Sequence, residues 1–127
     1  MIHCHKIAAL YLQYLEASDL TNLLSLFSDK AIVKSPLYGK MNALDFYKNL
    51  FKDTLTSGLT MDGVFVEEGS NRFTLVFDYC WKMKNSEEVK FKVVDIITLD
   101  NFSKIKELHI IYDTFESRRA FTKSSES

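Results

Sequence analysis

The spacing of apolar residues changes its period once along this chain, and that change constrains the fold more than any other feature. Up to Leu55, apolar side chains recur every three or four residues, which is the pattern of helices with one buried face. From Leu59 onward, apolar and polar residues alternate, which is the pattern of strands with one buried face. Helices first and strands afterwards predict an α+β domain whose helices cover one face of a curved antiparallel sheet.

Three helices are expected in the first half, and their apolar stripes span residues 7–15, 20–27 and 43–55. Ser18 or Asp19 offers an N-cap oxygen to the second helix, and Asn42 offers one to the third. A short strand over residues 31–35 is predicted between these two helices. It ends at Pro36, which has no backbone N–H for a sheet.

Four strands are expected in the second half, over residues 59–66, 72–83, 89–99 and 105–115. Their connections are short and rich in turn-forming residues, so neighbouring strands are predicted to be antiparallel hairpins. From Ser117 the chain is polar and serine-rich. We therefore predict one domain over residues 1–116 and a flexible polar tail over 117–127.

Charge and cysteine content exclude several classes of function. The net charge is −1 and no Lys/Arg cluster occurs, which argues against nucleic acid or an anionic membrane as a partner. No apolar run is long enough to span a membrane. Cys4 and Cys80 form no CxxC pair, which suits a reducing cytoplasm. No metal site is predicted, and the absence of a phosphate-binding glycine loop predicts no nucleotide cofactor.

The strand over residues 89–99 is apolar on both faces. Val93 and Ile97 lie on the face that carries Asp95, and Val94 and Ile96 lie on the opposite face. An antiparallel strand with two apolar faces needs a second layer, and a second copy of the chain is its simplest source. The sequence therefore predicts a homodimer through the outer sheet face.

Two stretches of sequence resemble a known superfamily. LEASDLTNLLSLFSDKAIVKSPLYGK, starting at Leu15, resembles the opening of SnoaL-like polyketide cyclases and ketosteroid-isomerase-like proteins of the NTF2-like superfamily. FKVVDIITLDNFSKIKELHIIYD, starting at Phe91, resembles their last two strands. The resemblance extends over residues 7–115 and implies a cone, in which three N-terminal helices pack on a curved antiparallel sheet. This fold hosts isomerases, dehydratases, cyclases and proteins without catalytic activity.

Three positions of the isomerase branch can be placed on this chain. The resemblance puts a hydroxyl donor at Tyr11 and a protonated carboxyl donor at Asp95, both directed at a substrate oxyanion. The position of the general-base carboxylate falls on Ser35, whose hydroxyl cannot accept a proton near neutral pH without a base of its own. The steroid-isomerase reaction itself is therefore not expected.

Each candidate also has a structural interpretation. Asp95 lies among apolar residues, where burial favours its neutral form, but it could equally hydrogen-bond a neighbouring element and organise the fold. Tyr11 lies on a buried helix stripe, where a core tyrosine usually finds a hydroxyl partner. Ser35 could orient a ligand or water, or simply end a strand. The face that carries Trp81 could be pocket wall or dimer contact.

The predicted ligand is a small, mostly apolar or carbonyl-containing compound. The residues expected to bind it are Ser35, Tyr14, Phe46, Phe91, Trp81, Ile110 and Tyr112. One hypothesis is an enzyme of isomerase or dehydratase type, in which Tyr11 and Asp95 polarise the carbonyl. The alternative is a homodimeric ligand-binding or protein-assembly module without catalysis.

Overall fold

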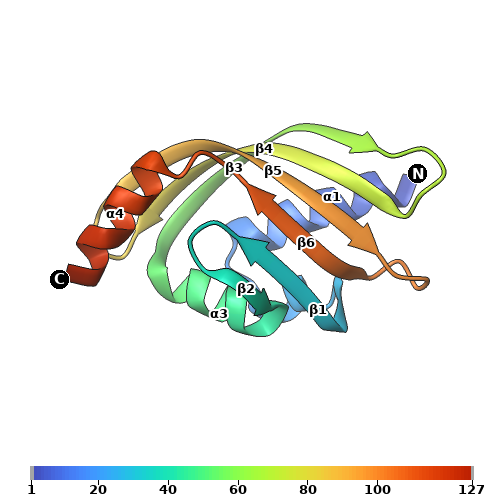
Figure 1. The fold of residues 1–127 in the computed structure, drawn as a ribbon, viewed down its shortest axis with the longest axis horizontal. Coiled ribbons are helices and arrows are strands. Elements are labelled where there is room, and N and C mark those ends of the chain that lie inside the picture. The colour runs from blue at the N-terminus through green and yellow to red at the C-terminus, as the bar shows by residue number, and fades with distance from the viewer. Residues whose placement is uncertain (1, 127) are drawn as a thin grey trace.

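The computed structural model describes residues 2–126, and the side chains of residues 3–120. Its elements, in chain order, are α1 (Ile2–Glu16), α2 (Leu20–Leu24), β1 (Phe27–Ser35), β2 (Gly39–Asn42), α3 (Ala43–Asp53), β3 (Thr54–Val66), β4 (Arg72–Met83), β5 (Glu88–Leu99), β6 (Ile105–Ile111) and α4 (Phe115–Glu126). The predicted order of helices followed by a long meander is confirmed (Figure 1).

The six strands form one sheet in the order β2-β1-β6-β5-β4-β3. Every neighbouring pair is antiparallel except β1 and β6, which are parallel, with Val33 opposite Leu108. The expected fully antiparallel sheet is thus corrected to a mixed one. After β2 and α3, the chain begins β3 at the far edge of the sheet. The strands β3, β4, β5 and β6 then follow one another back across the sheet, and β6 lies beside β1 in the same direction.

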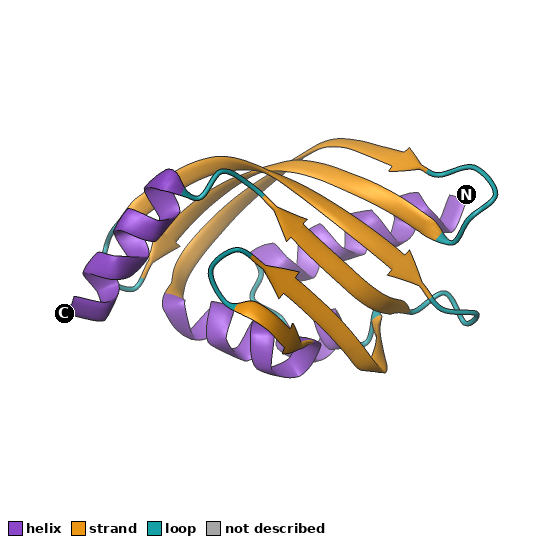
Figure 2. Ribbon diagram, in the orientation of Figure 1, coloured by secondary structure: helices purple, strands orange, loops and turns teal. Residues whose placement is uncertain are grey.

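The sheet is curved, and helices cover its concave side. Figure 2 shows the strands arching over α1 and α3, while α4 lies at one end of the sheet. Along β4, alternate side chains face the helices and are buried: Phe73, Leu75, Phe77, Tyr79, Trp81 and Met83. The aromatic face of this strand therefore lies inside the domain and not on the outer sheet surface.

The boundaries of α2 and β1 differ from the predicted ones. Both predicted N-caps are present, because Asp19 accepts from the Asn22 amide and Asn42 accepts from the Asp45 amide. However, α2 ends at Leu24, since Phe27 already pairs with Ile105 of β6. Pairing across the sheet thus draws Phe27 out of the predicted helix, and β1 begins four residues before the predicted strand.

A fourth helix, α4, occupies most of the segment predicted to be a polar tail, so the predicted count of three helices is corrected to four. The Asp113 side chain accepts a hydrogen bond from the backbone amide of Phe115, which stabilises the first turn. Arg118 donates to the Pro36 carbonyl at 2.8 Å, and Asn85 donates to the Ala120 carbonyl at 3.3 Å. These contacts hold the helix against the β1–β2 turn and the β4–β5 hairpin. The domain limit at residue 116 stays a prediction.

Candidate functional site

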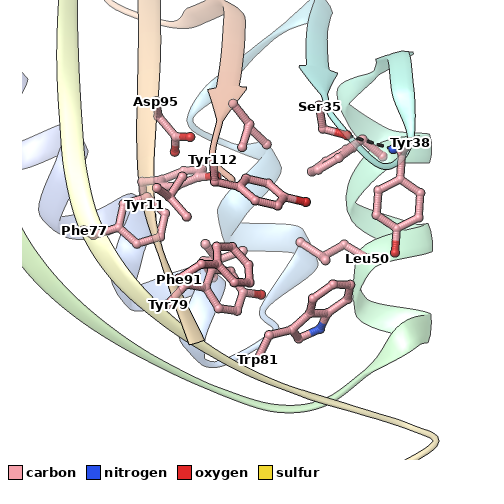
Figure 3. A pocket seen from close by; sticks show the side chains of 14 residues that line it. Tyr11, Ser35, Tyr38, Leu50, Phe77, Tyr79, Trp81, Phe91, Asp95 and Tyr112 are labelled. Carbon is pink, nitrogen blue, oxygen red and sulfur yellow. Dashed lines mark hydrogen bonds between the residues drawn. The ribbon is translucent and has the colours of Figure 1, made fainter. Parts of the chain in front are cut away.

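A cavity lies between the concave sheet face and helices α1 and α3 (Figure 3). It is lined by Tyr11, Leu15, Ser35, Tyr38, Phe46, Leu50, Phe77, Tyr79, Trp81, Phe91, Val93, Asp95, Ile110 and Tyr112. The cavity volume is about 40 Å³. A cavity needs roughly 10–15 Å³ to hold one water molecule, so this cavity has room for a few waters. Binding of an organic ligand requires the lining side chains to move apart.

Asp95 is the most unusual group in this lining. It lies in the middle of β5, opposite Leu75 of β4 and Ile110 of β6, and its side chain is 0% exposed. Neither carboxyl oxygen has a hydrogen-bond partner in the described part of the chain. Burial raises the pKa of Asp95 well above its usual value, which favours the neutral acid. A neutral carboxyl group can donate a hydrogen bond into the cavity.

Tyr11 reaches the same cavity from α1. Its hydroxyl oxygen is 2.8 Å from that of Tyr47 on α3, and both side chains are buried. Burial, followed by the nearby Tyr47 and Asp95 groups, raises the pKa of Tyr11 well above its usual value. Both tyrosines therefore remain protonated at neutral pH. When Tyr47 donates to Tyr11, the Tyr11 proton is available to a ligand.

Aromatic rings form the wall on the sheet side. Phe91 stacks on Tyr79 at a centroid distance of 5.4 Å and on Tyr112 at 4.4 Å. Burial raises the pKa of Tyr112 to about 12, so its hydroxyl is neutral as well. The three rings come from β4, β5 and the residue that follows β6, and they stack in one row.

The indole of Trp81 is fixed at the base of this wall. Its Nε1–H donates to the Thr54 hydroxyl at 2.8 Å, and that hydroxyl donates to the Leu50 carbonyl at 2.6 Å. All three residues are buried. The chain of bonds joins β4 to the junction between α3 and β3, and satisfies a buried donor that would otherwise cost stability.

Most of the predicted site residues meet at this cavity. Those that line it are Tyr11, Ser35, Phe46, Trp81, Phe91, Asp95, Ile110 and Tyr112. Tyr14 does not line it and packs, half-buried, against the core. The Ser35 hydroxyl accepts a hydrogen bond from the Tyr38 amide at 3.1 Å, so Ser35 also shapes the β1–β2 turn.

Two tyrosines of the site were missed from the sequence. Tyr47 was placed only on a buried helix stripe, and nothing in the spacing pairs it with Tyr11. Tyr38 is not among the predicted site residues, yet it lines the cavity and its hydroxyl donates to Asp53 at 2.6 Å. Both contacts join segments distant in sequence, which periodicity does not detect.

Within residues 2–126 no cluster of three or more metal-binding side chains occurs. The helices of this region are all too short or too polar to cross a membrane.

Comparison with known proteins gives matches of fold only. No protein-family model and no curated protein matches the sequence. An NTF2-like protein of unknown function from Exiguobacterium sp. 255-15 is 21% identical, with a TM-score of 0.72 over 84% of this chain and 98% of that one. A candidate SnoaL-like polyketide cyclase from Shewanella putrefaciens CN-32 is 14% identical, with a TM-score of 0.76 over 97% of this chain and 98% of that one.

The epoxide hydrolase/cyclase-like enzyme SalBIII, described in pyran ring formation in polyether salinomycin, is also similar. It is 15% identical, with a TM-score of 0.72 over 88% of this chain and 92% of that one. Such identities show a shared architecture and leave the chemistry open. The predicted resemblance is confirmed at the level of the fold: this chain has the NTF2-like fold.

Proposed function

We propose that this protein binds a small, mostly apolar carbonyl compound in the cavity, with Tyr11 and Asp95 donating hydrogen bonds to the carbonyl oxygen. The observation that carries the proposal is Asp95, which is fully buried, faces the cavity and has no partner for its carboxyl group in the described chain. An unsatisfied buried carboxyl group is costly, and a ligand acceptor would satisfy it.

The chemistry that these two donors support is isomerisation or dehydration next to a carbonyl. Removal of a proton from such a compound places negative charge on the carbonyl oxygen. Two fixed donors in an apolar cavity stabilise that charge more than they stabilise the neutral carbonyl, so they lower the barrier. The SnoaL-like and cyclase-like structural neighbours support small-molecule chemistry on this fold.

The size of the cavity limits the ligand. A volume of about 40 Å³ is far below the several hundred Å³ typical of pockets for larger ligands. A monocyclic compound is therefore a better probe than a polycyclic one. Its entry displaces the ring of Phe91 or Tyr112, which are half-buried.

A binding or assembly module without catalysis is the second candidate. The small volume of the cavity and the Tyr11–Tyr47 bond favour it, because both are also features of a well-packed core. The outer sheet face supports the accompanying homodimer. There, Val76, Val94 and Ile111 form one apolar row across β4, β5 and β6, and Phe65 is 63% exposed nearby. We propose that a second copy covers this face.

The cytoplasm is the proposed compartment. The structure contains two free cysteines, the buried Cys4 and the half-buried Cys80, which suit a reducing environment.

Titration with 4-nitrophenol tests the binding site, because this monocyclic phenol reports its own ionisation by colour. Two donors directed at its oxygen favour the bound phenolate, so binding should increase the phenolate absorbance. The increase should be lost in Tyr11→Phe and Asp95→Asn and kept in Tyr14→Phe, a control on the same helix but outside the cavity lining. If the wild-type protein does not bind the phenol, the non-catalytic module is the better account.

A further inference from the structure

The proposed chemistry needs a proton acceptor, and the donors cannot provide it. Asp95 is held in its neutral form by burial, and Ser35 has no base beside it in the described contacts. Another group must therefore accept the proton that the ligand loses. This question rests on the proposed function and identifies the group that moves the proton.

Tyr38 connects the cavity to a carboxylate. Its ring lines the cavity from the β1–β2 turn, and its hydroxyl donates to Asp53 Oδ2 at 2.6 Å. Asp53 is the last residue of α3 and is not itself part of the cavity lining. A short hydrogen bond between a phenol and a carboxylate is a ready path for a proton from the cavity wall to an acid group outside it.

The position of Tyr38 suits this role. Figure 3 shows Tyr38 and Asp95 entering from opposite sides, one from the β1–β2 turn and the other from β5. A carbonyl compound with its oxygen at Asp95 would have to extend across the cavity for its carbon skeleton to reach Tyr38. Two contacts hold Tyr38 in place. Its ring packs edge-on against Phe46 at a centroid distance of 5.5 Å, and its backbone amide donates a hydrogen bond to the Ser35 hydroxyl.

We propose that Tyr38 and Asp53 form a proton-relay dyad that serves as the base of this site. The C–H bond next to, or conjugated with, the carbonyl breaks, and its electron pair moves into the carbonyl to give an enolate. The released proton bonds to the Tyr38 hydroxyl oxygen, while the proton of that hydroxyl passes to Asp53 Oδ2. Return of the protons in the reverse order, at the same or a conjugated carbon, completes an exchange or an isomerisation.

The dyad avoids a charged phenol. Burial and the bond to Asp53 raise the pKa of Tyr38, so Tyr38 keeps a proton before and after the transfer. Tyr38 is then a catalytic residue that touches the substrate. Asp53 acts through it, both by orienting the hydroxyl and by taking up its proton.

Deuterium uptake tests this relay. The wild-type protein is incubated in D₂O with cyclohexanone and, separately, cyclohex-2-enone, and loss of the exchangeable ring protons is followed by NMR. We expect catalysed uptake that falls about a hundredfold or more in Tyr38→Phe and in Asp53→Asn. Asp45→Asn, a matched change at an exposed carboxylate of the same helix, should leave the rate unchanged.

Asp53→Asn separates the chemical role from a structural one. Its amide oxygen still accepts the Tyr38 hydrogen bond and preserves the turn, but an amide does not take up the proton. Binding of 4-nitrophenol and the melting temperature should therefore stay close to the wild type. Exchange that persists in Asp53→Asn would overturn the dyad.

The two proposals fail in different ways. A wild-type protein that binds 4-nitrophenol but exchanges neither ketone contradicts the dyad and leaves the binding site standing. A wild-type protein that binds no phenol contradicts the proposed function, and the dyad falls with it.

Discussion

The hydroxyl oxygens of Tyr11 and Tyr47 lie 2.8 Å apart in the core, where they join α1 to α3. This contact fixes one helix against the other and holds the Tyr11 hydroxyl beside the cavity that contains Asp95. One hydrogen bond thus serves the packing of the helices and the geometry of the candidate site.

Removal of the Tyr47 hydroxyl should lower stability, because it leaves the buried Tyr11 hydroxyl without its partner. We expect Tyr47→Phe to reduce the free energy of unfolding by about 1–3 kcal/mol, as measured by urea denaturation. Tyr11→Phe should cost a similar amount. The double variant should cost less than the sum of the two, and strictly additive losses would show that the hydroxyls do not interact.

The bond between Trp81 and Thr54 gives a second test of the core. Thr54→Val keeps the side-chain shape but leaves the buried indole N–H unpaired. The expected loss is about 1–3 kcal/mol in the free energy of unfolding. Thr56→Val, a matched change at an exposed position of the same strand, should stay within about 0.5 kcal/mol of the wild type. Equal effects at both positions would contradict the role of the hydrogen bond.

Asp95 should make stability depend on pH. Because its folded pKa is raised, the carboxyl group is neutral in the folded protein but ionised in the unfolded chain above about pH 4. Folding then takes up a proton, so the wild type loses up to about 1.4 kcal/mol per pH unit as the pH rises toward the folded pKa. Asp95→Asn lacks this loss.

Unfolding of both proteins should therefore be measured at several pH values. The stability of Asp95→Asn relative to the wild type should increase from about pH 5 to about pH 8. A difference that does not change with pH would mean that folding does not shift the pKa of Asp95.

The apolar row on the outer sheet face leads us to expect a homodimer. If a second copy covers the row of Val76, Val94 and Ile111, light scattering should give twice the chain mass of 14.7 kDa. Val94→Lys places a charge in the middle of that row and should yield monomers. Phe102→Lys, at a loop position that is 84% exposed, should remain dimeric. A monomeric wild-type protein would exclude this dimer.

The sequence predicts the elements of this fold better than their pairing. Alternation along residues 72–83 matches β4 residue for residue, because each buried side chain there faces the helices. The parallel contact between β1 and β6 could not be predicted, since it depends on where the meander ends in space. α4 was missed because its stabilising contacts with Pro36 and Asn85 come from distant turns.

In the candidate site, too, single residues can be predicted from the sequence more readily than the contacts between them. The sequence singles out Asp95, because a carboxyl group in the middle of an apolar strand face is unusual, and the structure shows it buried in the lining of the cavity. Its partner groups were harder to find. Nothing in the sequence pairs Tyr38 with Asp53, because their contact forms only where the β1–β2 hairpin and the end of α3 come together. The stacking of Phe91 on Tyr79 and Tyr112 could not be predicted either, since it joins side chains that are distant in sequence.

The protonation state of Asp95 tests the central claim most directly. Carbon NMR of protein labelled at aspartate carboxyl groups, with Asp95→Asn used to assign the signal, reports it without any ligand. We predict that the Asp95 carboxyl resonance stays at the position of the neutral acid near pH 7. A signal at the ionised position, titrating in the range of an ordinary exposed aspartate, would contradict a neutral donor in the cavity.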